Sequence, residues 1–373
     1  MKTKSMKFGD LFSYEGKSKI KAGDGLDTGE YPFYTSSNVL SKYLNEYLFN
    51  KPSLVFGTGG MASIHYCDSP FAVSTDCLVA YVKDESVCDT RFVYNYILGN
   101  IHLLEQGFKG AGLKHISKSY INEIQIPLPP LAVQKHISEI LDAAYALKRK
   151  DQDLLKKYDH LAQAIFIDMF GDPVKNEKGW EVHLFGEIFD TRLGKMLDAK
   201  KQAGNVKYKY LGNSNVQWFR FKLVNLGEME FSDKEISTFN LRKGDVLICE
   251  GGEVGRAAVW NEEIADLYFQ KAIHRARPKE NNITAEYTVM LLWFFAKNGG
   301  FKDYVSTSTI SHLTGEKLRT IPIPIPPYKE QLLFTDAIRI LDLNRYVVDN
   351  SIKKSNELID AIVFNCFNSE LIA

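Results

Sequence analysis

The chain has 373 residues, of which 45% are hydrophobic, and its 46 basic side chains balance 46 acidic ones. This length can bury two ordinary cores and predicts two domains. No signal peptide opens the sequence, and the longest apolar run, near 289–296, is far shorter than the roughly 20 residues of a membrane span. We therefore expect a cytoplasmic protein without membrane contact.

The cysteines do not form a recognisable site in the sequence. They lack the close CxxC pairs of a zinc site and the density of a secreted disulfide scaffold. Their positions are Cys67, Cys77, Cys88, Cys249 and Cys366. We expect no metal and no cofactor.

The first predicted domain covers residues 1–128 and is rich in strands. Runs such as SLVFGTGG from Ser53 and FAVSTDCLVAYV from Phe71 combine β-branched and aromatic residues with glycine turns, which is typical of short strands. One helix is expected near 90–104. The domain opens with six lysines between Lys2 and Lys21.

A long helix is predicted over residues 129–172, after the Pro129–Pro130 pair. Apolar or small residues recur there in alternating steps of three and four, as in a coiled-coil seam. The seam positions are Ile137, Ile140, Ala144, Leu147, Leu154, Tyr158, Leu161 and Ile165. A helix of about 40 residues is roughly 60 Å long, and another helix must cover its apolar stripe.

The second predicted domain covers residues 173–325 and has the same character. DVLICEGG from Asp245 and YFQKAIHRARP from Tyr268 read as strands, and 285–297 reads as a helix. The segment from Arg192 to Lys222 contains eight basic residues and only one acidic residue, Asp198. A solvated surface explains one such run, but basic runs at the start of both domains favour contact with phosphates.

A second long helix is predicted over residues 326–373, after Pro326–Pro327. Its seam also steps by three and four, with polar breaks and one charged position. The members are Ile338, Leu341, Arg345, Val348, Ile352, Ser355, Ile359 and Ile362. The simplest way to bury both seams is to pack the two helices against each other.

The chain contains an internal repeat. Residues 124–170 and 321–367 align without a gap at a shift of 197, beginning IQIPLPPLAVQ and IPIPIPPYKEQ. Weaker matches at a shift of 177 pair FGDLF with FGEIF, and YPFYTSSNV from Tyr31 with YKYLGNSNV from Tyr208. The order is domain, helix, domain, helix.

Catalytic motifs do not emerge from the sequence. IPPY at Ile325 lacks the polar side chain that an amino-methyltransferase motif needs, and the histidines have no nucleophile or ligand partner at a telling spacing. The clusters GTGG (Gly57–Gly60) and EGGEVGR (Glu250–Arg256) match no nucleotide-binding pattern. They can be tight turns or places where the backbone approaches DNA closely.

These features together resemble the DNA specificity (S) subunit of type I restriction-modification systems. The resemblance rests on the Ile-Pro-rich helix starts with Gln134 and Gln331, on MFGDP leading to Trp180, and on KGAGLKHIS and STSTISHLT before the two helix starts. The second copy has the family's Glu330 before its glutamine, whereas the first has Val133.

The resemblance implies an α+β fold with two similar β-rich target recognition domains. A long helix follows each domain, and the two helices pack as an antiparallel coiled coil. It also implies a non-catalytic restriction-modification subunit for phage defence. Such a subunit reads a bipartite, asymmetric site on double-stranded DNA and docks two methyltransferase (M) subunits and restriction/translocase (R) subunits. A two-module scaffold that binds proteins remains the alternative; a self-sufficient methyltransferase would need a cofactor site.

We expect DNA contacts from the basic runs, the polar loops after Tyr31–Tyr34 and Tyr208–Leu211, and the glycine clusters. Asn215 and Gln217 are the predicted base readers, whereas Lys200 and Lys201 are predicted to contact phosphates. The full set in the first domain is Lys17, Lys19, Thr35, Ser36, Ser37, Asn38, Gly59, Gly60, Lys109 and Lys114. In the second domain it is Lys195, Lys200, Lys201, Asn213, Ser214, Asn215, Gln217, Gly251, Gly252 and Arg256.

Partner subunits are expected on the helix faces outside the mutual seam, where further apolar residues occur. The predicted contacts are Leu141, Leu155, Phe166, Met169, Phe334 and Phe364.

Overall fold

A computed structural model describes residues 4–110, 112–196, 206–305 and 312–367. The chain divides into two compact units: unit 1 comprises residues 1–153 and 348–373, and unit 2 comprises residues 154–347. Each unit therefore holds one strand-rich domain and a half of each long helix. The sequence-based boundaries treated each long helix as a segment separate from the domains. In the structure, each half of a helix belongs to the unit of the domain on which it packs.

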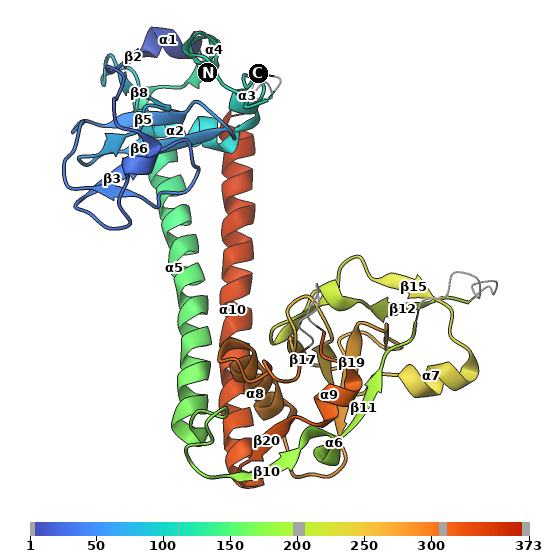
Figure 1. Cartoon of the computed structure of the whole chain (residues 1–373). Coiled ribbons are helices and arrows are strands. Elements are labelled where there is room, and N and C mark those ends of the chain that lie inside the picture. Colours follow the sequence, from blue (N-terminus) through green and yellow to red (C-terminus); the bar gives the residue numbers. More distant parts are fainter. Residues whose placement is uncertain (1–3, 111, 197–205, 306–311, 368–373) are drawn as a thin grey trace. The chain divides into compact units, whose positions relative to one another are not determined.

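The domain of unit 1 consists of short strands and helices (Figure 1). They are β1 (Lys4–Lys7), α1 (Phe8–Leu11), β2 (Phe12–Tyr14), η1 (Ala22–Asp24), β3 (Tyr31–Tyr34), β4 (Tyr43–Leu44), β5 (Ser53–Gly57), β6 (Ser63–Cys67), β7 (Ala72–Val73), β8 (Cys77–Val82), α2 (Thr90–Gly99), α3 (His102–Glu105), α4 (Lys118–Glu123) and β9 (Gln125–Leu128). The strands form an antiparallel sheet β2–β8–β5–β6, a second sheet β4–β3–β7 and the pair β1–β9.

The core of unit 1 lies between its larger sheet and α2. Every residue of β5 is buried, as expected for a central strand of β-branched and aromatic residues. Asp89 accepts a hydrogen bond from Phe92 N at the start of α2 (2.6 Å) and so caps this helix. The buried side chains of Phe92 and Ile97 join Leu54 and Phe56 in one cluster.

The domain of unit 2 has a similar order of elements. They are β10 (Glu181–Leu184), α6 (Phe185–Ile188), β11 (Phe189–Leu193), β12 (Tyr208–Leu211), η3 (Asn213–Asn215), β13 (Val216–Gln217), β14 (Arg220–Phe221), β15 (Gly227–Met229), α7 (Asp233–Phe239), β16 (Val246–Cys249), β17 (Ala257–Val259), β18 (Tyr268–Phe269), β19 (Ile273–Pro278), α8 (Ala285–Lys297), α9 (Gly315–Arg319) and β20 (Pro322–Ile325). The sheets are β11–β19–β16–β17, β15–β12–β18, β13–β14 and β10–β20.

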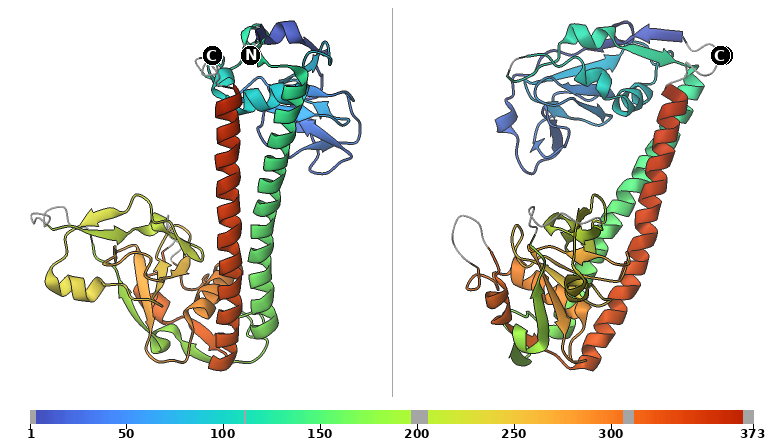
Figure 2. Two further views of the ribbon diagram at one scale, coloured as in Figure 1. Left: turned by 180° about the vertical axis from the view of Figure 1, so that it is seen from behind. Right: turned by 90° about the vertical axis from the view of Figure 1, so that its right-hand side faces the viewer.

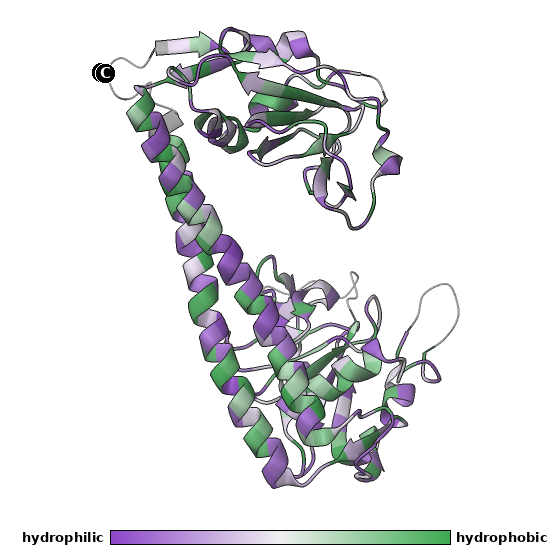
Figure 3. Ribbon diagram, turned by 90° about the vertical axis from the view of Figure 1, so that its left-hand side faces the viewer, coloured by the Kyte–Doolittle hydropathy of each residue, from purple (hydrophilic) through white to green (hydrophobic). Residues whose placement is uncertain are grey.

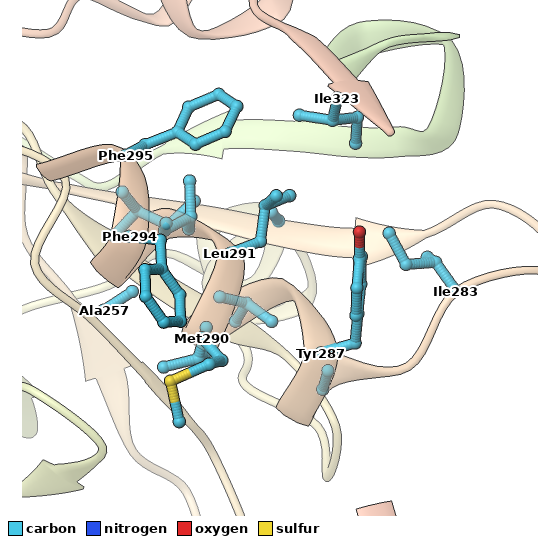
Figure 4. Packing of buried hydrophobic residues seen from close by; sticks show 14 of the residues in the cluster. Ala257, Ile283, Tyr287, Met290, Leu291, Phe294, Phe295 and Ile323 are labelled. Carbon is cyan, nitrogen blue, oxygen red and sulfur yellow. The ribbon is translucent and has the colours of Figure 1, made fainter. Parts of the chain in front are cut away.

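Helix α8 fills the core of unit 2. Its sequence is apolar around most of its circumference, so it is buried on several sides at once. Figure 4 shows Leu291 and Tyr287 of α8 on the side of Ile323 of β20, whereas the Phe294 ring points away from it. The Tyr287 hydroxyl donates to the carbonyl of Pro324 (2.8 Å), which satisfies this polar group inside the core.

The two domains repeat one topology. The sheet β2–β8–β5–β6 corresponds to β11–β19–β16–β17, β4–β3–β7 to β15–β12–β18, and β1–β9 to β10–β20. In both three-stranded sheets, one edge pairing is antiparallel and the other is parallel. The predicted α+β fold with two similar strand-rich domains is confirmed.

The repeated glutamines tie each long helix to its domain. Gln134 of α5 (Leu131–Phe170) is fully buried; its Oε1 accepts from Asp89 N (2.9 Å), and its Nε2 donates to Pro129 O (2.8 Å). Gln331 of α10 (Tyr328–Phe367) repeats this with Thr284 N (2.9 Å) and Pro326 O (2.8 Å). Each glutamine thus joins the proline-rich helix start to the N-cap of α2 or α8.

Within each unit, the halves of α5 and α10 run side by side in opposite directions (Figure 2). In unit 1, Ile137 and Ala144 of α5 share a buried cluster with Ile359 of α10. In unit 2, Phe166 of α5 and Phe334 of α10 have ring centroids 5.5 Å apart. The predicted packing of the two helices as an antiparallel pair is confirmed.

Some seam positions differ from the prediction. Ile140, Leu147 and Leu161 are exposed by 38–48%, whereas Leu141 is fully buried. The buried face of α5 in unit 1 follows Gln134, Ile137, Leu141 and Ala144, because it must cover the domain as well as the other helix.

The charged seam position in α10 has a partner. Arg345 donates to Asp159 of α5 (2.8 Å) and to Asp342 (3.1 Å) within unit 2. A charge at a helix–helix contact is tolerated when it is paired. The sequence pattern alone left this arginine as an interruption of the seam.

The set of expected partner contacts needs correction. Leu141, Phe166 and Phe334 are fully buried inside the cores of their own units, so their side chains cannot offer an exposed surface. Leu155 and Met169 are half-buried, and Phe364 is 57% exposed. None of the described helices is long and apolar enough to cross a bilayer.

Candidate nucleic-acid interface

In unit 1, the turn after β3 packs against the glycine loop Gly57–Gly60. The Ser36 hydroxyl donates to Asp76 O (2.8 Å), and its carbonyl accepts from the Ser63 hydroxyl (3.2 Å). A Cβ at Gly57 would lie 2.8 Å from Ser36 Cα, so the close approach of the two loops requires glycine.

A third loop joins this cluster. Gly59 pairs with His115 in an antiparallel bridge, and Gly60 N donates to Lys114 O (3.1 Å). Lys109 also pairs with His115, so the structure brings both predicted lysines to the glycine loop. Two apolar side chains that the sequence did not single out are highly exposed on these loops, Met61 (75%) and Leu113 (69%).

The remaining predicted residues of unit 1 lie around this loop cluster. Lys17 and Lys19 are exposed, and their segment is joined to it through Thr75 N donating to Ile20 O (2.8 Å). Thr35 and Ser37 mainly stabilise the turn itself, because their hydroxyls accept from backbone N–H groups two residues ahead. Asn38 is exposed beside them.

Unit 2 repeats the arrangement with different atoms. Asn213, which aligns with Ser36 at the shift of 177, donates through Nδ2 to Gly251 O (3.1 Å). Arg256 donates through Nη2 to Asn213 O (2.9 Å). Gly252 has a φ of +77°, and a Cβ there would lie 3.1 Å from Asn213 Nδ2, so glycine is required. Gly251 also pairs with His312, the repeat equivalent of His115.

A polar concave surface of about 1160 Å³ opens beside these residues in unit 2. Six predicted residues line it: Asn213, Ser214, Asn215, Gln217, Gly252 and Arg256. It is also lined by residues that the predicted set lacked, among them Tyr210, Arg220, Lys222 and Gln270. Arg220 and Lys222 belong to the basic run of the sequence, but Gln270 had no signal, because only the parallel pairing of β12 with β18 places it there.

The amide side chains on this surface divide into two kinds. Asn215 is 6% exposed; its Oδ1 accepts from Gly212 N (2.8 Å), and its Nδ2 donates to Lys222 O (2.8 Å). It therefore stabilises the turn and does not fit the predicted base-reading role. Gln217 Nε2 donates to Ser214 O (2.8 Å), which leaves Gln217 Oε1 available. The Gln270 side chain makes no hydrogen bond within the described residues, so its whole amide is available.

The cations also differ in their availability. Lys195 donates to Glu235 Oε2 (2.7 Å) and Glu230 O (2.6 Å), so its charge is used inside the fold and does not suit the predicted phosphate contact. Arg220 and Lys222 are exposed, and neither has a carboxylate partner within the described part of the chain. Lys200 and Lys201, the other predicted phosphate contacts, lie outside the described residues.

Burial shifts the pKa of one histidine and two cysteines of these domains toward their neutral forms. Burial lowers the pKa of His65, which contacts Ser37 O at 2.8 Å. It raises the pKa of Cys249, below the glycine loop of unit 2, to about 11, and that of Cys67 to about 12. At neutral pH both cysteines are therefore thiols.

A family model and curated relatives match most of this chain. The family model described as "Type I restriction modification DNA specificity domain" matches residues 2–157 and 177–347. The type I restriction enzyme EcoBI specificity subunit of Escherichia coli is 20% identical, over 96% of this chain and 81% of that protein. The EcoDI specificity subunit of E. coli is 22% identical, over 99% of this chain and 89% of its own length.

Solved structures share the fold. The S subunit of a type I restriction-modification system from M. genitalium superposes with a TM-score of 0.70 at 15% identity, covering 96% of this chain and 94% of that one. A chain from a structure of the type I restriction-modification system, described for its complex assembly and conformational transition, gives a TM-score of 0.55 at 15% identity and covers 99% and 98%. This chain belongs to the type I restriction-modification DNA specificity family.

Proposed function

We propose that this chain is the non-catalytic recognition subunit of a type I restriction-modification complex, reading a bipartite, asymmetric DNA site with one half-site for each unit. The observation that carries the proposal is that one loop scaffold presents different chemistry in the two units. Ser36 and Asn213 occupy equivalent places against equivalent glycine loops. Around them, unit 1 offers lysines with exposed Met61 and Leu113, whereas unit 2 offers Gln217, Gln270 and arginines.

Different donors and acceptors at equivalent places imply different base sequences. Glutamine amides can pair with adenine edges in the major groove, and lysine or arginine with guanine or phosphate. The glycine loops let the backbone approach the duplex closely. Two similar but non-identical readers therefore favour a site that is not a palindrome.

The long helices supply a surface for partner subunits. In unit 1, Val133, Ile140 and Leu147 of α5 repeat every seven residues and are exposed by 38–48%; we call them stripe 1. In unit 2, Leu333, Ile340 and Val347 of α10 repeat in the same way and are exposed by 57–66%; together with Leu343, which is 70% exposed, they form stripe 2. Figure 3 shows hydrophobic residues along both helices.

One exposed apolar stripe in each unit suits two copies of one partner. Apolar residues at heptad spacing are what a helix of another chain packs against. We infer that each stripe docks one methyltransferase (M) subunit, and that the restriction/translocase (R) subunits join the complex so formed. The assembly would act in the cytoplasm, where it meets DNA.

A scaffold that binds only proteins is the competing function, and salt dependence separates the two. The full chain, in complex with its methyltransferase, should bind duplex DNA with an affinity that falls linearly with salt on a log–log plot, with a slope of about −0.9 for each phosphate contacted. It should also be retained on heparin. A complex that forms normally but ignores heparin and duplex DNA at low salt would support the scaffold.

A further inference from the structure

The hairpin between β13 and β14 has an unusual tip. Gln217 pairs with Arg220, so Trp218 and Phe219 form a two-residue turn. Phe219 has a φ of +65°, in the left-handed region that glycine or asparagine normally occupies. A bulky aromatic side chain is disfavoured there, and the fold of unit 2 holds it in that conformation nonetheless.

Phe219 is also exposed, at 38%. Among the phenylalanines whose side chains the structure describes, only Phe219 and Phe364 are exposed. The hydrophobic effect favours burial of such a ring, and unit 2 buries its other described phenylalanines fully or in part. The ring meets Trp218 with centroids 6.0 Å apart, and the rest of its surface stays exposed at a strained tip.

Hydrogen bonds and ring contacts hold the hairpin against the rest of unit 2. Trp218 donates through its indole N–H to Glu253 Oε1 (2.8 Å), and Lys297 Nζ lies 3.0 Å from the same oxygen. Phe219 N donates to Ala257 O (3.0 Å). Behind the tip, Phe221 meets Trp260 edge-on with ring centroids 5.2 Å apart. The ring is thus presented by a braced turn rather than by a free loop, which reduces the entropy lost on binding.

The chemistry around the tip suits a nucleic acid. Gln217, Arg220 and Phe221, which flank the turn, line the polar concave surface of unit 2. Arg220 is exposed and has no carboxylate partner among the described residues, so it is available to a phosphate beside the ring. A protein partner of apolar character would meet cations and unpaired amides here, whereas a duplex offers acceptors for them and π-faces for the ring.

We propose that Phe219 is an aromatic wedge that inserts at a base step of the half-site bound by unit 2. The proposal rests on the function proposed above and adds a mode of recognition, because a wedge reads how easily a step unstacks rather than the edge of a base. Arg220 would hold the phosphate next to the opened step. Steps that unstack easily, such as TA or CA/TG, would then be favoured at this position.

The test uses the complex of the full chain with its methyltransferase subunits and a duplex that carries its methylated motif. The fluorescent base 2-aminopurine, whose emission rises when it unstacks, replaces one base at a time in the half-site of unit 2. With the wild-type complex, emission should rise on binding at one step of this half-site in addition to the adenine that the methyltransferase extrudes for methylation. Phe219→Gly should abolish this rise and weaken binding about tenfold, since stacking of a base on an aromatic ring is worth about that factor.

Phe219→Gly separates function from folding, because glycine accepts the positive φ without strain. Its thermal unfolding should occur at no lower temperature than that of the wild type. Val224→Ala is the matched control, since it removes another exposed apolar side chain (55%) of the same unit. This variant should keep the wild-type emission and affinity.

Three results would overturn the wedge. Unchanged emission and affinity in Phe219→Gly would show that the ring does not stack on bases. Loss of methyltransferase subunits from that variant, measured as a lower mass of the complex, would assign Phe219 to a protein contact. A wild-type complex that binds the motif no better than a scrambled duplex would reject the proposed function together with the wedge, whereas the first two results reject the wedge alone.

Discussion

At the scale of residues, one backbone scaffold carries two sets of side chains. Ser36 and Asn213 anchor equivalent turns to equivalent glycine loops, so the positions that hold the loops are shared. The side chains that point away from these anchors differ between the units. Specificity then depends on which amides and cations the anchors leave available, and variants can separate the two groups.

We predict that Gln270→Ala and Gln217→Ala change the base preference of one half-site. A bidentate amide contact discriminates against the wrong base by about 1–3 kcal/mol, so the methylated motif should become degenerate at single positions of that half-site. Sequencing of methylated DNA from cells carrying each variant measures this. A motif identical to that of the wild type would remove both glutamines from base reading.

Asn215→Ala is predicted to act on folding and not on reading. It leaves Gly212 N and Lys222 O without their partner inside the turn, which costs about 1–3 kcal/mol for each buried group that stays unsatisfied. Chemical unfolding should show the loss, whereas the motif methylated by the remaining folded protein should not change. A variant of full stability with an altered motif would reverse this assignment.

Two exposed cations should account for part of the affinity for any sequence. Replacing Arg220 and Lys222 together with alanine should make the slope of log affinity against log salt shallower by about 2, because each phosphate contact contributes about 0.9. Lys195→Met should leave the slope unchanged, since the Lys195 ammonium is already paired with Glu235. Equal effects of both changes would show that Lys195 reaches the DNA after all.

The sequence singled out the polar loop after Tyr208–Leu211 and the glycine cluster after Cys249 separately. The structure places them side by side, which the sequence did not indicate. Whether an asparagine points into the turn or out of it depends on the local hydrogen bonds, which composition does not reveal. Gln270 was not predictable, because a parallel pairing of Leu211 with Phe269, 58 residues apart in the chain, places it there. Gln270 N then donates to Leu211 O.

At the scale of elements, the two buried glutamines determine how each long helix leaves its domain. Each one joins a helix start, a proline carbonyl and the N-cap region of the domain's own helix. The sequence identified the glutamines through the repeat, but their partners were not evident because those partners are backbone atoms. The coiled-coil period, in turn, predicted that the helices pair, but it misplaced the buried face of α5 by one residue at Leu141.

Gln134→Ala and Gln331→Ala should each destabilise the unit that contains the residue. Besides Asp89 N and Pro129 O, Gln134 also bonds Val87 O, and Gln331 likewise bonds Asn282 O. The change therefore leaves one N–H and two carbonyls without their side-chain partner, and we expect a loss of about 2–4 kcal/mol in the free energy of unfolding. Gln152→Ala, at an exposed position of α5, is the control and should change stability by less than about 0.5 kcal/mol. Similar stability of all three variants would mean that the glutamines do not determine the helix starts.

Stripe 2 should be needed for the docking of a methyltransferase subunit. Ile340→Glu or Leu343→Glu places a charge on the apolar stripe, where desolvation would be costly in the complex. The mass of the purified complex should fall by one methyltransferase subunit while the chain itself stays folded. Gln152→Glu adds the same charge at an exposed position of α5, outside both stripes, and should leave the mass unchanged.

At the scale of the whole molecule, the two units are linked by two unbroken helices of 40 residues each. Both helices pass from one unit to the other, α5 after Asp153 and α10 after Val347. We propose that the length of this helix pair sets the number of unread base pairs between the half-sites. The repeat in the sequence indicated two recognition domains joined by one pair of helices; the bases that they recognise depend on side-chain contacts with DNA.

Lengthening both helices should therefore lengthen the spacer. Seven residues inserted after Asp153 and after Val347 would preserve the heptad pattern and add about 10 Å, which corresponds to about three base pairs at 3.4 Å each. The methylated motif should keep both half-sites and gain about three unread pairs between them. A folded, active variant that methylates the original spacing would show that the helices do not set the spacer.

The central claim is that the two units read two different half-sites. Sequencing of methylated positions in the genome of a cell that carries this chain and its methyltransferase tests it most directly. We predict one motif made of two short, unrelated half-sites separated by a fixed number of unread pairs. A palindromic motif, or a single contiguous one, would contradict the claim.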